Sequence, residues 1–489
     1  MKHNLTITLS IVITSFFMIA CSHTSYQIDV DPVDQTRFDL SSAPATLTEA
    51  VKIRTISFSD TSATEASAFD SIHKFIMVSY PNIHASLERE VINTHSLLYT
   101  WTGSSRELNP VILLAHTDVV PAGWDSTSTW KVDPFGGIMM DDTVWGRGTL
   151  DDKMSVFGIL EAVESLLNKG YQPERTIYLA FGHDEEIGGD KGAEYLAGTL
   201  VDRHITADLI LDEGGIIVED GVPGITLPVA LVGVAEKGYL SLELVAKGVG
   251  GHSSMPPKQT AIGVLSQAIV DLQEHPLPSA LDGPIREMLV TLAPETGFPF
   301  NFLFSNLWAF GGIIKGQLAA SPKSNALIRT TTAPTMINAG FKDNALPSEA
   351  RAVVNFRLKP GESIEAVIQH VEKVIDNPNV SIGIYGKGAN PASKVSDHQN
   401  DQFKAVAKSI RQTFPGILVS PYISVGGTDA IHYEDVSNNI YRFSPVQLSS
   451  ERLDGLHGSN ERIAVSEYAR LINFYIQVIR NSTGPERLW

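Results

Sequence analysis

Acidic residues and histidines recur in this chain next to short apolar segments. The segment GHDEEIGG, at residues 182–189, places three carboxylates side by side directly after the apolar run TIYLAF. Similar residues follow or precede other regular segments: His116 and Asp118, Asp151 and Asp152, and Asp212 and Glu213. Neighbouring carboxylates at the end of a buried strand repel one another, and removing them from water is unfavourable. Because a bound divalent cation offsets both effects, the pattern indicates a metal site.

Each group alone has a simpler interpretation. A single histidine after a strand is usually a hydrogen-bonded structural residue, and Asp151 and Asp152 could cap the helix that follows them. The three adjacent acids could form a solvated turn, and LDEGG a glycine-rich loop. Taken together the groups favour a cation site, because ligands of open α/β sheets lie beyond the carboxyl ends of the strands.

The elements that must position these residues alternate in type. Apolar runs at 111–115, 176–182 and 208–212 predict buried parallel strands. Residues 153–170 carry apolar side chains at helical spacing and end in a glycine that suits a helix C-cap. Strand, helix and strand in this order predict an α/β domain with a mostly parallel central sheet.

The pattern changes near Lys237. Polar and apolar side chains then alternate, as is typical of half-exposed antiparallel strands, in residues 239–248, 350–358 and 380–386. Residues 361–375 predict an amphipathic helix, and GKGANPAS is typical of a loop. We therefore expect a catalytic domain at 46–236 and 395–489, interrupted by a smaller α+β domain of ferredoxin-like type at 237–394.

The N-terminus is typical of an export signal. Lys2 precedes an apolar run that is short for a membrane span and ends at Ala20, before the only cysteine, Cys21. The ending MIAC is similar to the lipobox of bacterial lipoproteins, in which Cys21 is lipidated; the alternative is an ordinary signal peptide. We expect a signal peptide at 1–21, a polar tether at 22–45, and an exported, membrane-anchored protein of a bacterial cell envelope, facing the periplasm or the cell surface.

Composition excludes several functions. The formal net charge is -18, so nucleic acid, which requires a basic surface, is not an expected partner. One cysteine excludes an intrachain disulfide and a cysteine-ligated metal. After residue 21 the sequence holds no apolar run long enough for a transmembrane helix.

Eight motifs follow one another along the chain: HTDVVP, GRGTLDDK, GHDEEIGG, LDEGG, GGHSSMP, NALPSEARAVVNFRLKPG, GGTDA and HGSNERI. In this order they resemble the di-zinc metallopeptidase family that contains carboxypeptidase S, aminoacylase, carnosinase and glutamate carboxypeptidase. The resemblance is greatest to the carboxypeptidase S branch, which includes secreted N-acyl-amino-acid hydrolases. It covers residues 45–489.

The resemblance implies a ligand set for two divalent ions. His116 and Asp212 bind one zinc ion, Glu186 and His457 bind the other, and Asp151 bridges both. Two cations about 3.5–4 Å apart can share a hydroxide and lower its pKa to roughly 7. Manganese or cobalt could take the place of zinc, because carboxylates and imidazoles accept several metals.

The same resemblance assigns the neighbouring residues. Asp118 hydrogen-bonds His116 and fixes its orientation. Glu185 is the general base, since it adjoins a ligand but does not itself bind metal. Asp152 and Glu213 receive no metal role.

The inserted domain is implied to be a lid or dimerisation domain. His252 would stabilise the tetrahedral oxyanion and, in dimeric relatives, reach the partner subunit's site; the alternative is a turn histidine. Asn344 and Arg357 would bind polar groups of the substrate, and the fork of Arg357 suits a carboxylate, although a strand-end arginine can also be a surface residue. Gly426 and Gly427 would present backbone N–H groups to that carboxylate, but glycine pairs are also common in turns.

These observations predict a metal-dependent amidohydrolase that cleaves the amide bond next to a C-terminal amino acid in a peptide or an N-acyl amino acid. An aminopeptidase on the same zinc fold would not need carboxylate recognition by Arg357. A non-catalytic binding lipoprotein is disfavoured, because every proposed ligand and the base Glu185 are present. The expected partners are the small substrate, a membrane through the lipid anchor only and, if the protein dimerises, a second copy of the chain.

Overall fold

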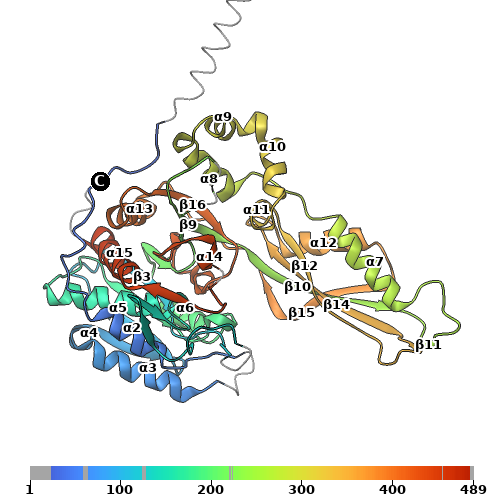
Figure 1. Ribbon diagram of the computed structural model, residues 1–489, viewed down its shortest axis with the longest axis horizontal. Helices are drawn as coiled ribbons and strands as arrows, with labels where there is room; N and C mark the ends of the chain where they lie inside the picture. Colours follow the sequence, from blue (N-terminus) through green and yellow to red (C-terminus); the bar gives the residue numbers. More distant parts are fainter. Residues whose placement is uncertain are drawn as a thin grey trace, which may run out of the picture.

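The protein consists of a large lobe and an elongated smaller one (Figure 1). The structure, a computed structural model, describes residues 24–484 except 59–63, 124–127, 220–221, 223 and 454. The expected signal peptide and Cys21 lie outside these residues. None of the helices in the described part of the chain is both long and apolar enough to cross a membrane.

The large lobe is built around a ten-stranded mixed sheet whose centre is parallel. Here β3 (Val111–His116) lies between β6 (Ile177–Gly182) and β7 (Leu209–Asp212), and β17 (Ile440–Arg442) continues the parallel pairing beyond β7. β3, β6 and β7 are buried along their whole length. Their continuous apolar sequences are those expected of strands that are covered on both faces. The three strands expected from the sequence are confirmed.

Strands of both directions complete the sheet at its margins. Antiparallel β1 (Glu88–Ile92) and β2 (Ser96–Trp101) extend it beyond β6. The opposite margin holds β9 (Val229–Glu236), β8 (Ile217–Val218), β16 (Leu418–Ser424) and β18 (Gln447–Leu448). A separate three-stranded sheet contains β4 (Ile138–Met140), β5 (Thr143–Trp145) and β19 (Arg462–Ala464).

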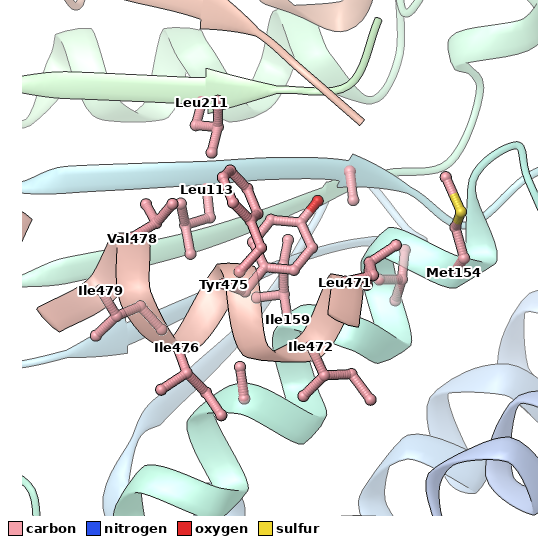
Figure 2. Close-up of a cluster of buried hydrophobic side chains, with 14 of the residues drawn as sticks. Leu113, Met154, Ile159, Leu211, Leu471, Ile472, Tyr475, Ile476, Val478 and Ile479 are labelled. Atoms are coloured by element: carbon pink, nitrogen blue, oxygen red, sulfur yellow. The ribbon is translucent and has the colours of Figure 1, made fainter. Parts of the chain in front are cut away.

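Helices cover the two faces of the central sheet according to the alternation of side chains along each strand. Leu113 of β3 and Leu211 of β7 pack against α5 (Lys153–Asn168) and α15 (Val465–Thr483), as Figure 2 shows. Ile112 and Leu114, the residues on either side of Leu113, face the other way and pack with α6 (Ala193–Asp202). Further helices are α2 (Ala43–Val51), α3 (Ala66–Ser79), α4 (Pro81–Ser86), α13 (Asp401–Thr413) and α14 (Ser450–Leu453).

The smaller lobe, hereafter the lid, is an antiparallel sheet with two helices on one face. In chain order it contains β10 (Gly238–Lys247), α7 (Ala261–Glu274), β12 (Thr331–Ala339), β14 (Glu349–Leu358), α12 (Ile364–Ile375) and β15 (Val380–Asn390). The sheet order β12-β14-β10-β15 is that of a ferredoxin-like fold, which confirms the predicted architecture. A two-stranded antiparallel sheet of β11 (Gly251–His252) and β13 (Ala345–Leu346), strands far apart in sequence, projects from it (Figure 1) and is called the lid hairpin below.

Four helices that lie in sequence within the predicted insertion do not join the lid sheet. They are α8 (Gly283–Leu292), α9 (Phe300–Ser305), α10 (Leu307–Ala319) and α11 (Pro322–Ile328). Apolar side chains of α8 pack with Val229 of β9 and Leu418 of β16, so this subdomain rests on the large lobe. The apolar pattern along the sequence could not show against which sheet these helices pack.

The described part of the expected tether has no helix or strand before α2 begins at Ala43. It is nevertheless hydrogen-bonded to the large lobe. The Gln27 side chain accepts a hydrogen bond from the backbone N–H of Val419 (2.8 Å) and donates one to its carbonyl oxygen (3.0 Å). The N–H of Val33 donates to the carbonyl of Gln412 at 2.9 Å. Residues 24–42 are therefore fastened to the surface of the large lobe.

Candidate two-metal site

Neighbouring parallel strands bring the predicted residues to one edge of the sheet. His116 is the last residue of β3 and is paired in register with Gly182, the last residue of β6. Glu185 and Glu186 come three and four residues after Gly182, in the short helix η2 (Glu185–Ile187). Asp212 ends β7 on the other side of β3. The sequence therefore places all of these residues at the carboxyl ends of adjacent strands.

Ligand-type atoms converge in two groups that share one residue. The first group is His116, Asp151 and Glu213, and the second is Asp151, Glu186 and His457; within each, the atoms lie within 4.8 Å of one another. Oδ1 of Asp151 is 2.9 Å from His116 Nε2, and its Oδ2 is 2.8 Å from His457 Nε2. A carboxylate with one oxygen in each group can bridge two cations about 3.5–4 Å apart.

The chemistry of these donors fits divalent cations. Burial, together with the nearby charge of Asp151, raises the pKa of Glu213 to about 8. Hydrogen bonds to Asp151 and Glu186 raise the pKa of His457 to about 10. Oε1 of Glu186 is buried with no hydrogen-bond partner among the described residues. Buried carboxylates that draw protons onto themselves and onto neighbouring histidines need positive charge, which metal ions would supply.

Glu213 occupies the position that the sequence analysis gave to Asp212. Glu213 Oε1 lies 3.3 Å from His116 Nε2, next to Asp151. The carboxylate of Asp212 instead accepts hydrogen bonds from the backbone N–H groups of Glu213 (2.9 Å) and Ala430 (2.8 Å). Successive residues leave a strand in different directions, so two adjacent acids cannot be distinguished from sequence alone.

Asp118 links the first histidine to the pair of glutamates. Its Oδ1 lies 3.2 Å from His116 Nδ1 and also accepts the backbone N–H of Glu185, while its Oδ2 accepts the N–H of Glu186 and the hydroxyl of Ser57. Nδ1 of His116 is also 3.1 Å from the backbone carbonyl oxygen of Asp118, so this residue supplies the acceptors for Nδ1–H. Nε2, 2.9 Å from Asp151, is thereby the nitrogen that could bind a metal ion.

Glu185 lies beside the first group without joining it. Its Oε2 is 3.9 Å from His116 Nε2, which is too long for a hydrogen bond. Burial raises the pKa of Glu185 well above its usual value, although the nearby His116 opposes the shift. The carboxylate is therefore close to both groups and available for proton transfer.

A buried ion pair that the sequence analysis did not assign holds two loops of the site together. Arg147 and Glu461 are 2% and 0% exposed, and their side chains are hydrogen-bonded to each other. Glu461 also accepts three backbone N–H groups of the loop that ends at Asp151, and Arg147 donates to the carbonyl oxygens of His457 and Gly458. Both residues occur in quoted motifs, but only the fold shows that GRGT and SNERI meet.

His252 and Asn344 lie together, but far from the metal groups. His252 is exposed in β11, and the N–H of Ser253 donates to the carbonyl of Asn344. Figure 1 places this hairpin at the end of the lid that points away from the large lobe. The Nδ1 atom of His252 accepts the N–H of Ser254 at 3.2 Å, so Nε2 carries the proton and presents a donor to solvent.

The remaining predicted substrate contacts lie in two other places. Arg357 of β14 is paired with Tyr239, near the start of β10, and its guanidinium is 4.9 Å from the centre of the Tyr239 ring. Gly426 and Gly427 are exposed in the loop between β16 and η4 (Asp429–Tyr433). Among the described residues, the structure thus brings together the predicted ligands, with Glu213 in place of Asp212, the predicted base Glu185, and Asp118.

A large α/β lobe with two carboxylate–histidine groups that share one aspartate is the arrangement of a two-metal hydrolase. A model of the peptidase family M20/M25/M40 matches residues 112–481, and the chain belongs to this family. Membership confirms the expected metallopeptidase family and its enzyme class, metal-dependent amide hydrolysis.

Two relatives illustrate the similarity. The chain is 41% identical over 440 residues to the probable carboxypeptidase S-like 2 of Dictyostelium discoideum, covering 89% of this chain and 84% of the relative. It is 39% identical over 436 residues to the N-fatty-acyl-amino acid synthase/hydrolase PM20D1 of Xenopus tropicalis, covering 88% and 84%.

A solved structure shows the same fold. It is the M20 family metallo-carboxypeptidase Sso-CP2 from Sulfolobus solfataricus, with a TM-score of 0.66 and 19% sequence identity. The match covers 90% of this chain and 98% of that one, so catalytic lobe and lid are both included.

Proposed function

We propose that the protein hydrolyses the amide bond next to a C-terminal amino acid, in a peptide or an N-acyl amino acid, with two divalent ions held by His116, Asp151, Glu213, Glu186 and His457. The observation that carries the proposal is the sharing of Asp151 between the two groups, with Glu185 beside them. Zinc is the expected ion, although this donor set also accepts manganese or cobalt. The names of the relatives support both substrate classes.

Different residues of the protein would have different roles in the reaction. Bound ions would polarise the amide carbonyl and lower the pKa of water to roughly 7. Glu185 accepts a proton from the attacking water and delivers it to the leaving nitrogen. Asp118 holds His116 and the backbone of both glutamates in place, so Glu185 and Glu186 keep their separate tasks.

The free carboxylate of the substrate would be bound on the lid side. Arg357 is the candidate, because its planar fork binds a carboxylate bidentately and its side chain is already held over the Tyr239 ring. His252, whose Nε2–H is directed to solvent, would donate to the oxyanion. Because the hairpin points away from the groups of its own chain, it would reach a site after lid closure or in a second copy of the protein.

Replacing the base tests the proposal. Glu185→Gln should keep two ions per chain but lower kcat by roughly 10²–10⁴-fold on dipeptides and N-acyl amino acids. Elemental analysis together with single-substrate kinetics measures both quantities. Turnover near that of the unmodified protein would exclude Glu185 as the base, and loss of an ion would mean that Glu185 is a ligand.

We further propose that Cys21 carries the membrane anchor of an exported lipoprotein. The support is the apolar run that ends in MIAC and the lack of a second cysteine. Stable anchoring requires more than one acyl chain, which lipoproteins carry. Mass spectrometry of the mature N-terminus tests this: an acylated Cys21 is expected, and an unmodified N-terminus beyond Cys21 would refute it.

A further inference from the structure

The helix α10 is apolar on all sides but is covered on only one. Its sequence, LWAFGGIIKGQLA, contains a single charged residue, and Ile314 is its only fully buried side chain. Exposed apolar or small residues of α10, together with Phe298 just before α9, form a set that we call the α9–α10 face: Phe298, Trp308, Ala309, Gly312, Ile313 and Gly316. Trp308 is 88% exposed and Phe298 75%. An apolar surface of this kind marks a docking site.

The first described residues of the chain lie beside this face. The hydroxyl of Ser25 donates to Glu295, three residues before Phe298, and Tyr26 lines a cavity together with Val290 of α8. Ser25 is the fourth residue after Cys21, and a fully extended chain spans at most about 14 Å over four residue steps. An acyl group on Cys21 would therefore enter a membrane next to α9.

The charge of this segment differs from that of the rest of the protein. The whole chain has a net charge of -18, but Thr296 to Thr330 contains no aspartate or glutamate and three cations, Lys315, Lys323 and Arg329. Lys315 lines a groove with Trp308, and Lys323 is exposed at the start of α11. Apolar side chains bordered by lysines suit the boundary between anionic headgroups and acyl chains.

We propose that the α9–α10 face docks onto an anionic phospholipid bilayer, with Trp308, Ile313 and Phe298 inserted among the lipids. Docking at this face would fix the orientation of the enzyme on the membrane. The four helices rest on the large lobe rather than on the lid sheet. The lid would therefore remain free to move above a catalytic lobe held at the surface.

Trp308 itself reports on docking, because the other described tryptophans, Trp101, Trp130 and Trp145, are buried. The full-length protein is bound to vesicles of phosphatidylethanolamine and phosphatidylglycerol, with or without brominated acyl chains. The difference between its emission and that of Trp308→Phe isolates the signal of Trp308. We expect this signal to shift to shorter wavelength on vesicles and to lose most of its intensity with brominated lipid.

A matched control uses the lid. Phe341 is 87% exposed, and in a Trp308→Phe background the variant Phe341→Trp should emit without a shift or quenching on the same vesicles. Trp308→Phe should hydrolyse soluble N-acetyl amino acids at the unmodified rate, which verifies folding.

The outcomes separate docking from lipid anchoring. Protein that sediments with vesicles while Trp308 stays unquenched would overturn docking but not the anchor. Equal quenching at positions 308 and 341 would also overturn it. If Trp308 is shielded because two copies associate, Trp308→Ser will lower the molar mass in solution and brominated lipid will have no effect, which again overturns the proposal. Quenching of Trp308 in Cys21→Ser would support docking even if the anchor hypothesis failed.

Discussion

The sheet edge and the lid hairpin both carry residues expected to act on the substrate, but they differ in how firmly each is held. At the sheet edge, Asp118 fixes His116, and the Arg147–Glu461 pair joins the loops of Asp151 and His457. On the hairpin, His252 is exposed and its hydrogen bonds run to the nearby Ser254.

The sheet edge is therefore a preformed part of the site, whereas the lid hairpin must move, or come from another copy, to take part. Metal ligands need fixed geometry, and one chain provides it through buried hydrogen bonds. An oxyanion donor is needed only in the transition state, so it can arrive by lid closure or from another copy. Substitutions of the proposed metal ligands at the sheet edge should therefore change metal content, whereas substitutions in the lid should change only kinetics.

The largest effect is expected at the first metal group. Glu213→Gln should reduce the metal content from two ions per chain to one, and lower activity by more than the roughly 10–100-fold typical of losing an outer partner of a ligand. Asp212→Asn keeps an acceptor oxygen for the backbone and should retain both ions. Elemental analysis of the two variants decides between these neighbours; the reverse result would restore Asp212 as the ligand.

A smaller loss is expected at the hairpin. His252→Ala should lower kcat by about 10²–10³-fold, as for loss of one oxyanion donor, with both ions retained. If the histidine acts between two copies, mixing this variant with Glu185→Gln should restore activity, because a mixed dimer contains one intact site. A fully active His252→Ala would limit the lid to a structural role.

A third prediction concerns Arg357, which lies near the end of β14 and is paired with Tyr239 near the start of β10. Arg357→Lys keeps the charge but loses the planar fork, so KM should rise by roughly tenfold with little change in kcat. The measurement compares free-acid substrates with their C-terminal amides. Equal cleavage of both by the unmodified enzyme would contradict a carboxylate-binding role for Arg357.

The smallest effect concerns stability in the core of the large lobe. Burial raises the pKa of Glu161, although its carboxylate accepts the Tyr80 hydroxyl at 3.1 Å. A raised folded pKa means that the protonated form favours folding. This contribution is complete below the unfolded value of about 4.3 and is lost as the pH rises through the folded pKa.

Glu161→Gln should therefore increase the free energy of unfolding at pH 8 by on the order of 1 kcal/mol, with a smaller gain at pH 5. Thermal unfolding at the two pH values provides the measurement. Glu243→Gln in the lid, which only loses a partly exposed ion pair with Arg351, is the control and should change stability less. A gain at pH 5 equal to that at pH 8 would argue against the buried charge as the cause.

The sequence predicted those features that local patterns determine. Continuous apolar runs identified β3, β6 and β7, and the alternating segments identified the lid sheet. The sequence could not distinguish Asp212 from Glu213, because adjacent side chains at the end of β7 point in different directions and only the fold shows that Glu213 approaches His116.

The other features that the sequence analysis did not predict depend on long-range packing. The position of α8 to α11 depends on contacts with β9 and β16, which local periodicity does not encode. Glu461 also has no local pattern of its own, since its partners lie more than 300 residues earlier in the chain.

The discontinuity of the large lobe has a consequence for the order of synthesis. The lid sheet is completed by Asn390, whereas β17 and α15, which complete and cover the central sheet, follow it in the chain. Because domains of a growing chain fold in sequence, the lid can fold while the catalytic sheet still lacks its neighbour for β7. His457 and Glu461 also follow the lid in the chain, so a chain that stops after the lid would lack part of the second group of proposed ligands. The proposed two-metal site can therefore form only after the segment that follows the lid has been synthesised.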